Sequence, residues 1–329
     1  MKLLNNFQAI IREETKEFAP AQARHFAWLC AVRALPFLGI RMRFRYWKRN
    51  ERQEHLFSIF WTLDVVRLMT LEDAKLNPDE ASDVARSAVS AAAIAANATK
   101  NLTITNTASA IANAANVVVD ETNTIENVYA AAIKTANASI YAARSATPRF
   151  SLSSFLDFFL SLIFILSISF FVFVFSAYIL EQFTNMTHTH ALMLAFIPVT
   201  IILVIILVVC WVRERQQTTN FSRIILNDVE AIKTGKLDNI SYDTKMYGKT
   251  WRKFIRSLTK TKCNYWAEIY EHLFENQFTM DTDELWRRIE VPRRIQAKGA
   301  AHVGQYMVEQ RKQREYEARR RERKVVSPN

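Results

Sequence analysis

The sequence predicts an all-α membrane protein: a two-helix transmembrane hairpin with cytoplasmic helical domains on both sides. Two uncharged apolar runs, 158–180 and 191–212, lie either side of a ten-residue loop. With 23 and 22 residues, each exceeds the roughly 20 helical residues that cross a hydrocarbon core. Gly (5) and Pro (7) are scarce, which is typical of helices joined by short connectors.

The charges that flank these runs predict the orientation. The loop 181–190 contains no Lys or Arg, whereas Arg144 and Arg149 precede the first run and Arg213 and Arg215 follow the second. Because Lys and Arg are enriched on the cytoplasmic side, both termini are expected in the cytoplasm. The three cysteines are odd in number and far apart, which indicates a reducing compartment. The expected location is therefore an inner membrane crossed twice.

Shifts in composition divide the chain into five regions. These are a basic amphipathic helical region (1–77), an Ala-rich helical bundle (78–148), the transmembrane hairpin (155–212), a C-terminal helical module (213–310) and a basic tail (311–329).

The first region is basic and contains a cluster of cations interleaved with aromatic residues. It holds 13 Lys and Arg against 8 Asp and Glu. The cations expected to contact a membrane surface are Arg41, Arg43, Arg45, Lys48 and Arg49, and Phe44, Tyr46 and Trp47 lie between them. Such a mixture suits a layer of anionic lipid headgroups. Two alternatives stay open: an ordinary core helix with a solvated basic face, and a nucleic-acid backbone contact with rings stacked on bases.

The second region is rich in alanine. Between Asp79 and Ala146, Ala accounts for 22 of 68 residues, and Gly and Pro do not occur. Small side chains let helices approach closely, so we expect two or three helices packed within the chain, broken around 100–107 and 120–124, where Thr and Asn are poor helix formers. The alternative is a single long stalk or a bundle between copies.

Serines within the first apolar run suggest self-association. Ser161, Ser169 and Ser176 follow one another at intervals of eight and seven residues, which places them along one helix face. Small polar residues allow close helix contact in lipid, and we therefore expect a homo-oligomer. The alternative is that these serines bond only to the backbone of their own helix.

The C-terminal module shows a recognisable spacing over 264–307. Its markers are Trp266, Tyr270, Leu273, Asp283, Trp286, Ile289, Val291-Pro292, Lys298-Gly299 and Ala301-His302-Val303. This pattern resembles a C-terminal segment of uncharacterised Ala-rich bacterial proteins. It departs from the pattern at Asn276, Gln296 and Ala300, where Gly, Trp and Pro are expected. The resemblance implies a bacterial or phage-related origin and a small helical module, with no known activity.

No motif of catalysis, cofactor binding or metal binding stands out in the sequence. Gly248, Lys249 and Thr250 match the end of a phosphate-binding loop, but Asp243 occupies the place of its first glycine. The six histidines form no H-E-x-x-H pair. We therefore expect no enzyme, no cofactor and no metal. The last stretch, 311–324, has eight Lys and Arg against three Glu, typical of a charged helix or a disordered tail.

These features favour a bacterial inner-membrane protein that acts by interaction or by membrane perturbation, for example as a two-helix effector of an antiviral defence or prophage system. Its expected partners are a bilayer with anionic lipid and further copies of itself. One alternative is a passive anchor or scaffold that recruits a cytoplasmic protein partner. The other, ranked last, is a membrane-tethered protein that binds nucleic acid.

Overall fold

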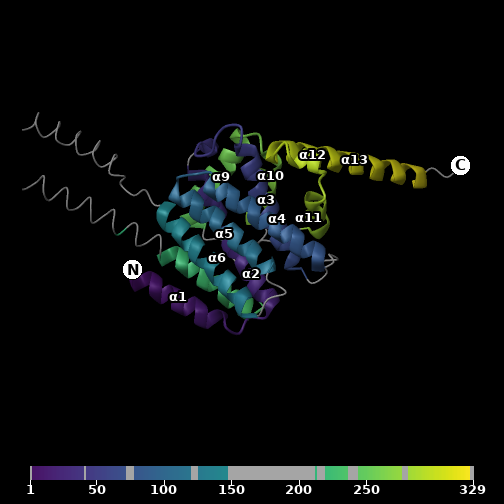
Figure 1. Cartoon of the computed structure of the whole chain (residues 1–329). Coiled ribbons are helices and arrows are strands. Elements are labelled where there is room, and N and C mark those ends of the chain that lie inside the picture. The colour runs from purple at the N-terminus through teal and green to yellow at the C-terminus, as the bar shows by residue number, and fades with distance from the viewer. Residues whose placement is uncertain are drawn as a thin grey trace, which may run out of the picture. The chain divides into compact units, whose positions relative to one another are not determined.

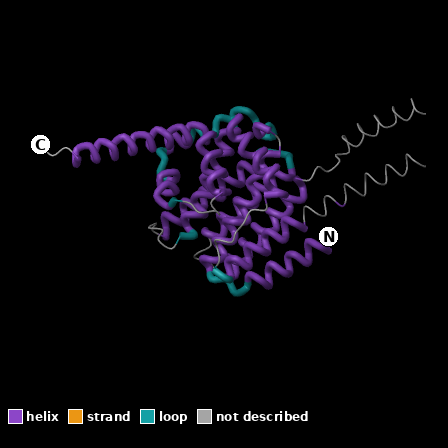
Figure 2. Tube along the Cα trace, turned by 180° about the vertical axis from the view of Figure 1, so that it is seen from behind, coloured by secondary structure: helices purple, strands orange, loops and turns teal. Residues whose placement is uncertain are grey.

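The computed structural model describes residues 2–40, 42–71, 78–119, 125–146, 212, 219–235, 244–275 and 281–326. Every regular element in these ranges is a helix (Figure 2). The described helices belong to a compact unit formed by 1–146 and 219–329.

The prediction of a membrane-spanning fold is corrected by the described helices. Among these residues, no helix combines the length and the apolar character needed to cross a membrane. This finding contradicts the predicted fold class with its transmembrane hairpin, and with it the two-span inner-membrane location. The reason is that the described helices are amphipathic or rich in Ala and hydroxyl residues, so apolar side chains cover only part of each. Of the two runs that motivated the prediction, 158–180 and residues 191–211 of the second lie outside the described residues.

Three Ala-rich helices form the middle of the unit: α4 (Pro78–Asn97), α5 (Leu102–Val119) and α6 (Ile125–Ala146). The central helix α5 packs against both α4 and α6, as Figure 1 shows. Helix α4 ends at Asn97 and α5 begins at Leu102, so the first break in the Ala-rich segment lies at 98–101. The first break comes slightly earlier than expected, because the Asn101 side chain caps α5 by accepting hydrogen bonds from the backbone of Thr103 and Ile104.

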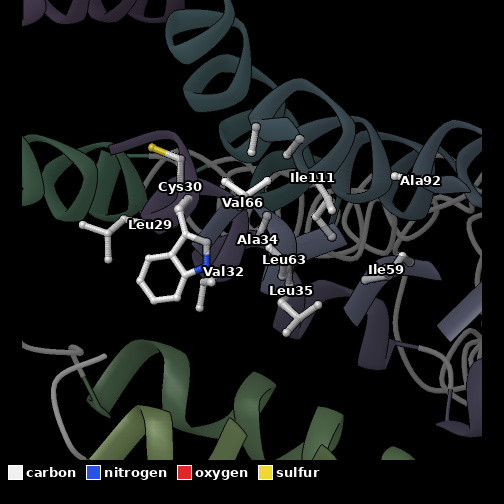
Figure 3. Packing of buried hydrophobic residues seen from close by; sticks show 14 of the residues in the cluster. Leu29, Cys30, Val32, Ala34, Leu35, Ile59, Leu63, Val66, Ala92 and Ile111 are labelled. Carbon is white, nitrogen blue, oxygen red and sulfur yellow. The ribbon is translucent and has the colours of Figure 1, made fainter. Parts of the chain in front are cut away.

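Two N-terminal helices complete this core. Helix α2 (Pro20–Ala34) packs on α5 and α6, and α3 (Arg52–Met69) packs on α4 and α5. Figure 3 shows the result: Val32 and Leu63 from these helices lie among Ala92 of α4 and Ile111 of α5. Large residues on α2 and α3 fill the space that alanines on the bundle leave open. Helix α1 (Lys2–Thr15) lies against α6.

The C-terminal half adds a helix over 219–233 and then α9 (Thr244–Lys260), α10 (Asn264–Glu275), α11 (Thr282–Ile289), α12 (Arg293–Gln296) and α13 (Ala300–Val326). The aromatic residues of α10 pack on α3: Trp266 stacks on Phe60 at 4.8 Å between ring centroids, and Tyr270 lies tilted against the same ring at 5.2 Å. The N-terminal and C-terminal halves therefore share one core.

Candidate functional site

Helix α9 carries the most uniformly charged surface among the described helices. Between Thr244 and Cys263 the chain has seven Lys and Arg and no Asp or Glu. Trp251, Phe254 and Leu258 recur at three- and four-residue spacing and are buried, so this stripe faces the core. The cations on the rest of the helix are exposed: Lys249, Arg252, Lys253, Arg256 and Lys260. This surface is not among the sites predicted from the sequence, although the acid-free run 244–263 is a signal for it.

The predicted basic cluster lies in a short 3₁₀ segment and the loop after it. A segment over Met42–Phe44 follows the 3₁₀ helix η1 (Leu35–Ile40). Arg43 and Phe44 have φ values of 64° and 51°, a left-handed backbone that side chains rarely adopt. This turn buries Phe44 completely while Arg43 and Arg45 stay exposed. Lys48 and Arg49 are exposed as well, and Arg41 lies outside the described residues.

Aromatic residues of this cluster, Phe44 and Trp47, belong to the core. Trp47 is 2% exposed and its Nε1 donates a hydrogen bond to the Ala95 carbonyl at 3.0 Å. The Tyr46 hydroxyl donates to the Leu38 carbonyl at 2.9 Å. With Phe44 and Trp47 packed inside, neither ring is placed to enter a lipid headgroup layer or to stack on a base. What the loop exposes is its cations.

The loop and α9 are held together by close packing. A Cβ on Gly39 would come within 2.5 Å of the Phe254 Cα, so η1 and α9 touch backbone to backbone. The Phe44 and Phe254 rings meet edge to face at 6.3 Å between centroids. Side-chain and backbone packing thus fixes both elements relative to one another.

The start of α3 connects the two sets of cations. Burial lowers the pKa of Arg52, and the positive charges of Arg45 and Arg49 lower it further, as expected when guanidinium groups lie near one another. The next residue, Gln53, donates from Nε2 to the Thr261 carbonyl at 2.8 Å, beside the end of α9. We call this region the basic surface and define it as Arg43, Arg45, Arg49, Arg52, Lys249, Arg252, Lys253, Arg256 and Lys262.

Carboxylates are sparse around the basic surface. The nearby Glu51 pairs with Lys48, at 3.2 Å between Oε1 and Nζ. In the described part of the chain, the defined cations form no salt bridge with a carboxylate. Arg52 is half-buried and donates to the Trp47 carbonyl, whereas the other defined cations are exposed. Exposed cations of one sign attract a polyanion.

A cleft between α10, α11 and α13 is the second place where charged residues converge. Its volume is about 760 Å³. At its wall, Glu284 accepts a hydrogen bond from the Tyr265 hydroxyl at 2.7 Å and lies 3.5 Å from Arg287 and Arg311 and 3.6 Å from Arg314. The guanidinium groups are thus occupied by a carboxylate of the chain itself. We interpret the cleft as a structural junction that joins α11 to α13.

The buried thiols and acidic groups offer little for catalysis. Burial raises the pKa of Cys30 and raises that of Cys263 to about 11, which disfavours the reactive thiolate form. The buried Asp228 and Asp64 are engaged with Arg33 and Arg288. Within the described ranges, no group of three or more His, Cys, Asp or Glu is arranged to hold a metal ion.

The three serines on which the expected self-association depends, Ser161, Ser169 and Ser176, lie outside the described residues. The described residues of the segment 264–307 form α10, α11, α12 and the start of α13, with Trp266 and Tyr270 each 1% exposed. No family model, no curated protein and no solved structure matches this chain.

Proposed function

We propose that this protein is a non-catalytic binding protein whose basic surface holds the phosphate backbone of a nucleic acid. The observation that carries the proposal is the acid-free exposed face of α9 beside the cations of 43–49. Phosphates along a nucleic acid are closely and regularly spaced, so a surface of unpaired cations can neutralise several at once.

The chemistry of the basic surface favours binding without sequence preference. Sequence is read by side chains that reach base edges, whereas Lys and Arg contacts to phosphate only position the ligand. Stacking platforms for unpaired bases need exposed rings, but Phe44, Trp47 and Trp251 are buried. The expected ligand contact is therefore the phosphate backbone.

The proposal is tested by salt titration with the full chain and a fluorescent 24-base-pair duplex. Replacing Arg252, Lys253 and Arg256 with Gln removes three phosphate contacts. Because each contact contributes about 0.9 to the slope of log K against log salt, the slope should fall by roughly 2 to 3. The matched control replaces Arg12, Arg86 and Lys134, which are exposed on α1, α4 and α6, and should leave the slope unchanged.

Two results would contradict the proposal. One is the absence of duplex binding by the wild-type chain at low salt. The other is an equal decrease of the salt slope in the α9 variant and in its control. Vesicles that contain phosphatidylserine provide the second arm. If the α9 variant loses vesicle binding while no duplex binds, the cations serve a lipid surface and the nucleic-acid proposal fails.

A further inference from the structure

Helix α13 extends beyond the rest of the compact unit. It has 27 residues, a length of about 40 Å at 1.5 Å per residue. Val303 and Met307 are buried, whereas the positions from Glu315 to Arg321 are all exposed. Both views show this helix leaving the body of the unit and ending away from it (Figures 1 and 2).

Contacts at the start of α13 fix its direction relative to the basic surface. The Gln53 Oε1 accepts a hydrogen bond from the Ala301 backbone at 2.9 Å, while the Nε2 of the same side chain bonds to Thr261. Trp266 Nε1 donates to the Ala300 carbonyl at 2.9 Å. One side chain therefore joins the start of α13, the end of α9 and the start of α3.

The packed half of α13 is held at a second point further along the helix. Arg311 and Arg314 lie 3.5 and 3.6 Å from Glu284 of α11, and Arg311 also pairs with Glu268 of α10 at 3.0 Å. Two points of attachment on one helix define its axis. The exposed half thus continues the axis of an anchored helix.

The exposed half of α13 carries mostly positive charge and lacks an apolar stripe. From Glu315 to Lys324 the sequence has five Lys and Arg against three Glu. A coiled coil with a second copy needs apolar residues at 3.5-residue spacing, but beyond Val308 the run over 309–324 offers only Tyr316 and Ala318. Charge complementarity therefore points to a polyanion rather than to another copy of the helix.

We infer that α13 is a second arm of the nucleic-acid contact, and that the ligand is a double helix long enough to reach both α13 and the basic surface. The inference rests on the proposed function. One turn of duplex spans about 34 Å, which is comparable with the length of α13. On this inference, a small anion or a duplex shorter than one turn should contact only one of the two cation sets.

The test compares 8- and 24-base-pair duplexes bound to the full chain. Replacing Arg319, Arg320 and Arg321 with Gln removes three exposed cations and keeps residues that favour helix. Linked contacts raise the affinity only when one ligand spans both. The affinity of this variant should therefore fall by roughly tenfold or more for the 24-base-pair duplex and by less than threefold for the 8-base-pair duplex. Circular dichroism at 222 nm verifies that helix content is kept.

The outcomes separate this inference from the proposed function. If the α9 variant loses duplex binding while the α13 variant binds both lengths like wild type, the proposed function stands and the second arm is refuted. If the wild-type chain binds neither duplex, the proposed function itself fails. A 24-nucleotide single strand bound as tightly as the duplex would overturn the assignment of a double helix.

Discussion

His25, Arg67 and the buried Trp28 form a partly buried group whose contacts depend on the protonation of one imidazole. The His25 Nδ1 lies 2.9 Å from Arg67 Nη1, and the Arg67 guanidinium lies over the Trp28 ring at 4.7 Å from its centroid. Because a guanidinium only donates hydrogen bonds, Nδ1 accepts and the imidazole is neutral. Burial, followed by the charge of Arg67, lowers the pKa of His25 to about 3.

The lowered pKa of His25 predicts that the protein loses stability in acid. In the unfolded chain His25 takes up a proton below its ordinary pKa of 6.5, while the folded protein resists protonation down to about pH 3. The free energy of unfolding should therefore fall between these values, by at most about 1.4 kcal/mol per pH unit. Urea denaturation at pH 7 and pH 4.5 measures this fall. His25→Gln should show a smaller fall than wild type, and an identical fall would exclude His25 as a cause.

At the scale of the elements, hydroxyl groups explain how Thr and Ser fit inside Ala-rich helices. Thr107 Oγ1 donates to the Thr103 carbonyl at 2.8 Å, and Thr135 Oγ1 donates to that of Ala131 at 2.9 Å. Ser139 Oγ reaches both Thr135 and the Cys30 carbonyl of α2, the latter at 2.8 Å. Bonding to the preceding turn satisfies these buried groups, so α5 and α6 keep polar residues in their packed faces.

The contact between Gly39 of η1 and α9 gives a prediction, and Gly248 of α9 provides its control. Gly39→Ala should destabilise the protein by about 1 to 3 kcal/mol, because its Cβ would meet the Phe254 backbone at 2.5 Å. Gly248→Ala, whose nearest new neighbour is 3.9 Å away, should stabilise α9 by up to about 1 kcal/mol. Chemical denaturation measures both. Equal effects of the two substitutions would show that the close approach is not needed.

At the scale of the whole molecule, two buried ion pairs join segments that are far apart in the sequence. Arg33 of α2 binds Asp228 through two hydrogen bonds of 2.6 Å, and Arg288 of α11 binds Asp64 of α3 at 2.7 and 3.0 Å. Each side chain is at most 3% exposed. Bidentate geometry fixes the angle between partners as well as their distance. The C-terminal helices therefore dock in a defined register on the N-terminal bundle.

This arrangement predicts a single unfolding transition for the compact unit. Asp228→Ala leaves Arg33 without its carboxylate and should lower the free energy of unfolding by about 3 to 5 kcal/mol. The exposed pair of Lys16 and Glu13 is the control, since Lys16→Gln should cost less than about 1 kcal/mol. Tryptophan fluorescence and circular dichroism should report the same midpoint in each variant. Separate midpoints would show that the two halves unfold independently.

The sequence by itself determined the helical class, because scarce Gly and Pro are typical of helices joined by short connectors. From small side chains and from cations between aromatic residues it also predicted an Ala-rich bundle and a basic contact surface. The apolar runs at 158–180 and 191–212 predicted spans, yet no described helix meets the requirement for one. The local apolar runs thus predicted membrane spans that the described helices do not provide.

Only the tertiary structure decided which residues form the candidate site. Phe44 and Trp47 alternate with cations and read as surface residues, but a left-handed turn and the Ala95 carbonyl hold them in the core. The cations of α9 lie some 200 residues further along the chain, and only the packing of Gly39 on Phe254 brings them beside the loop. Contacts between distant segments depend on shape and hydrogen bonding in three dimensions, for which a single sequence carries no periodic signal.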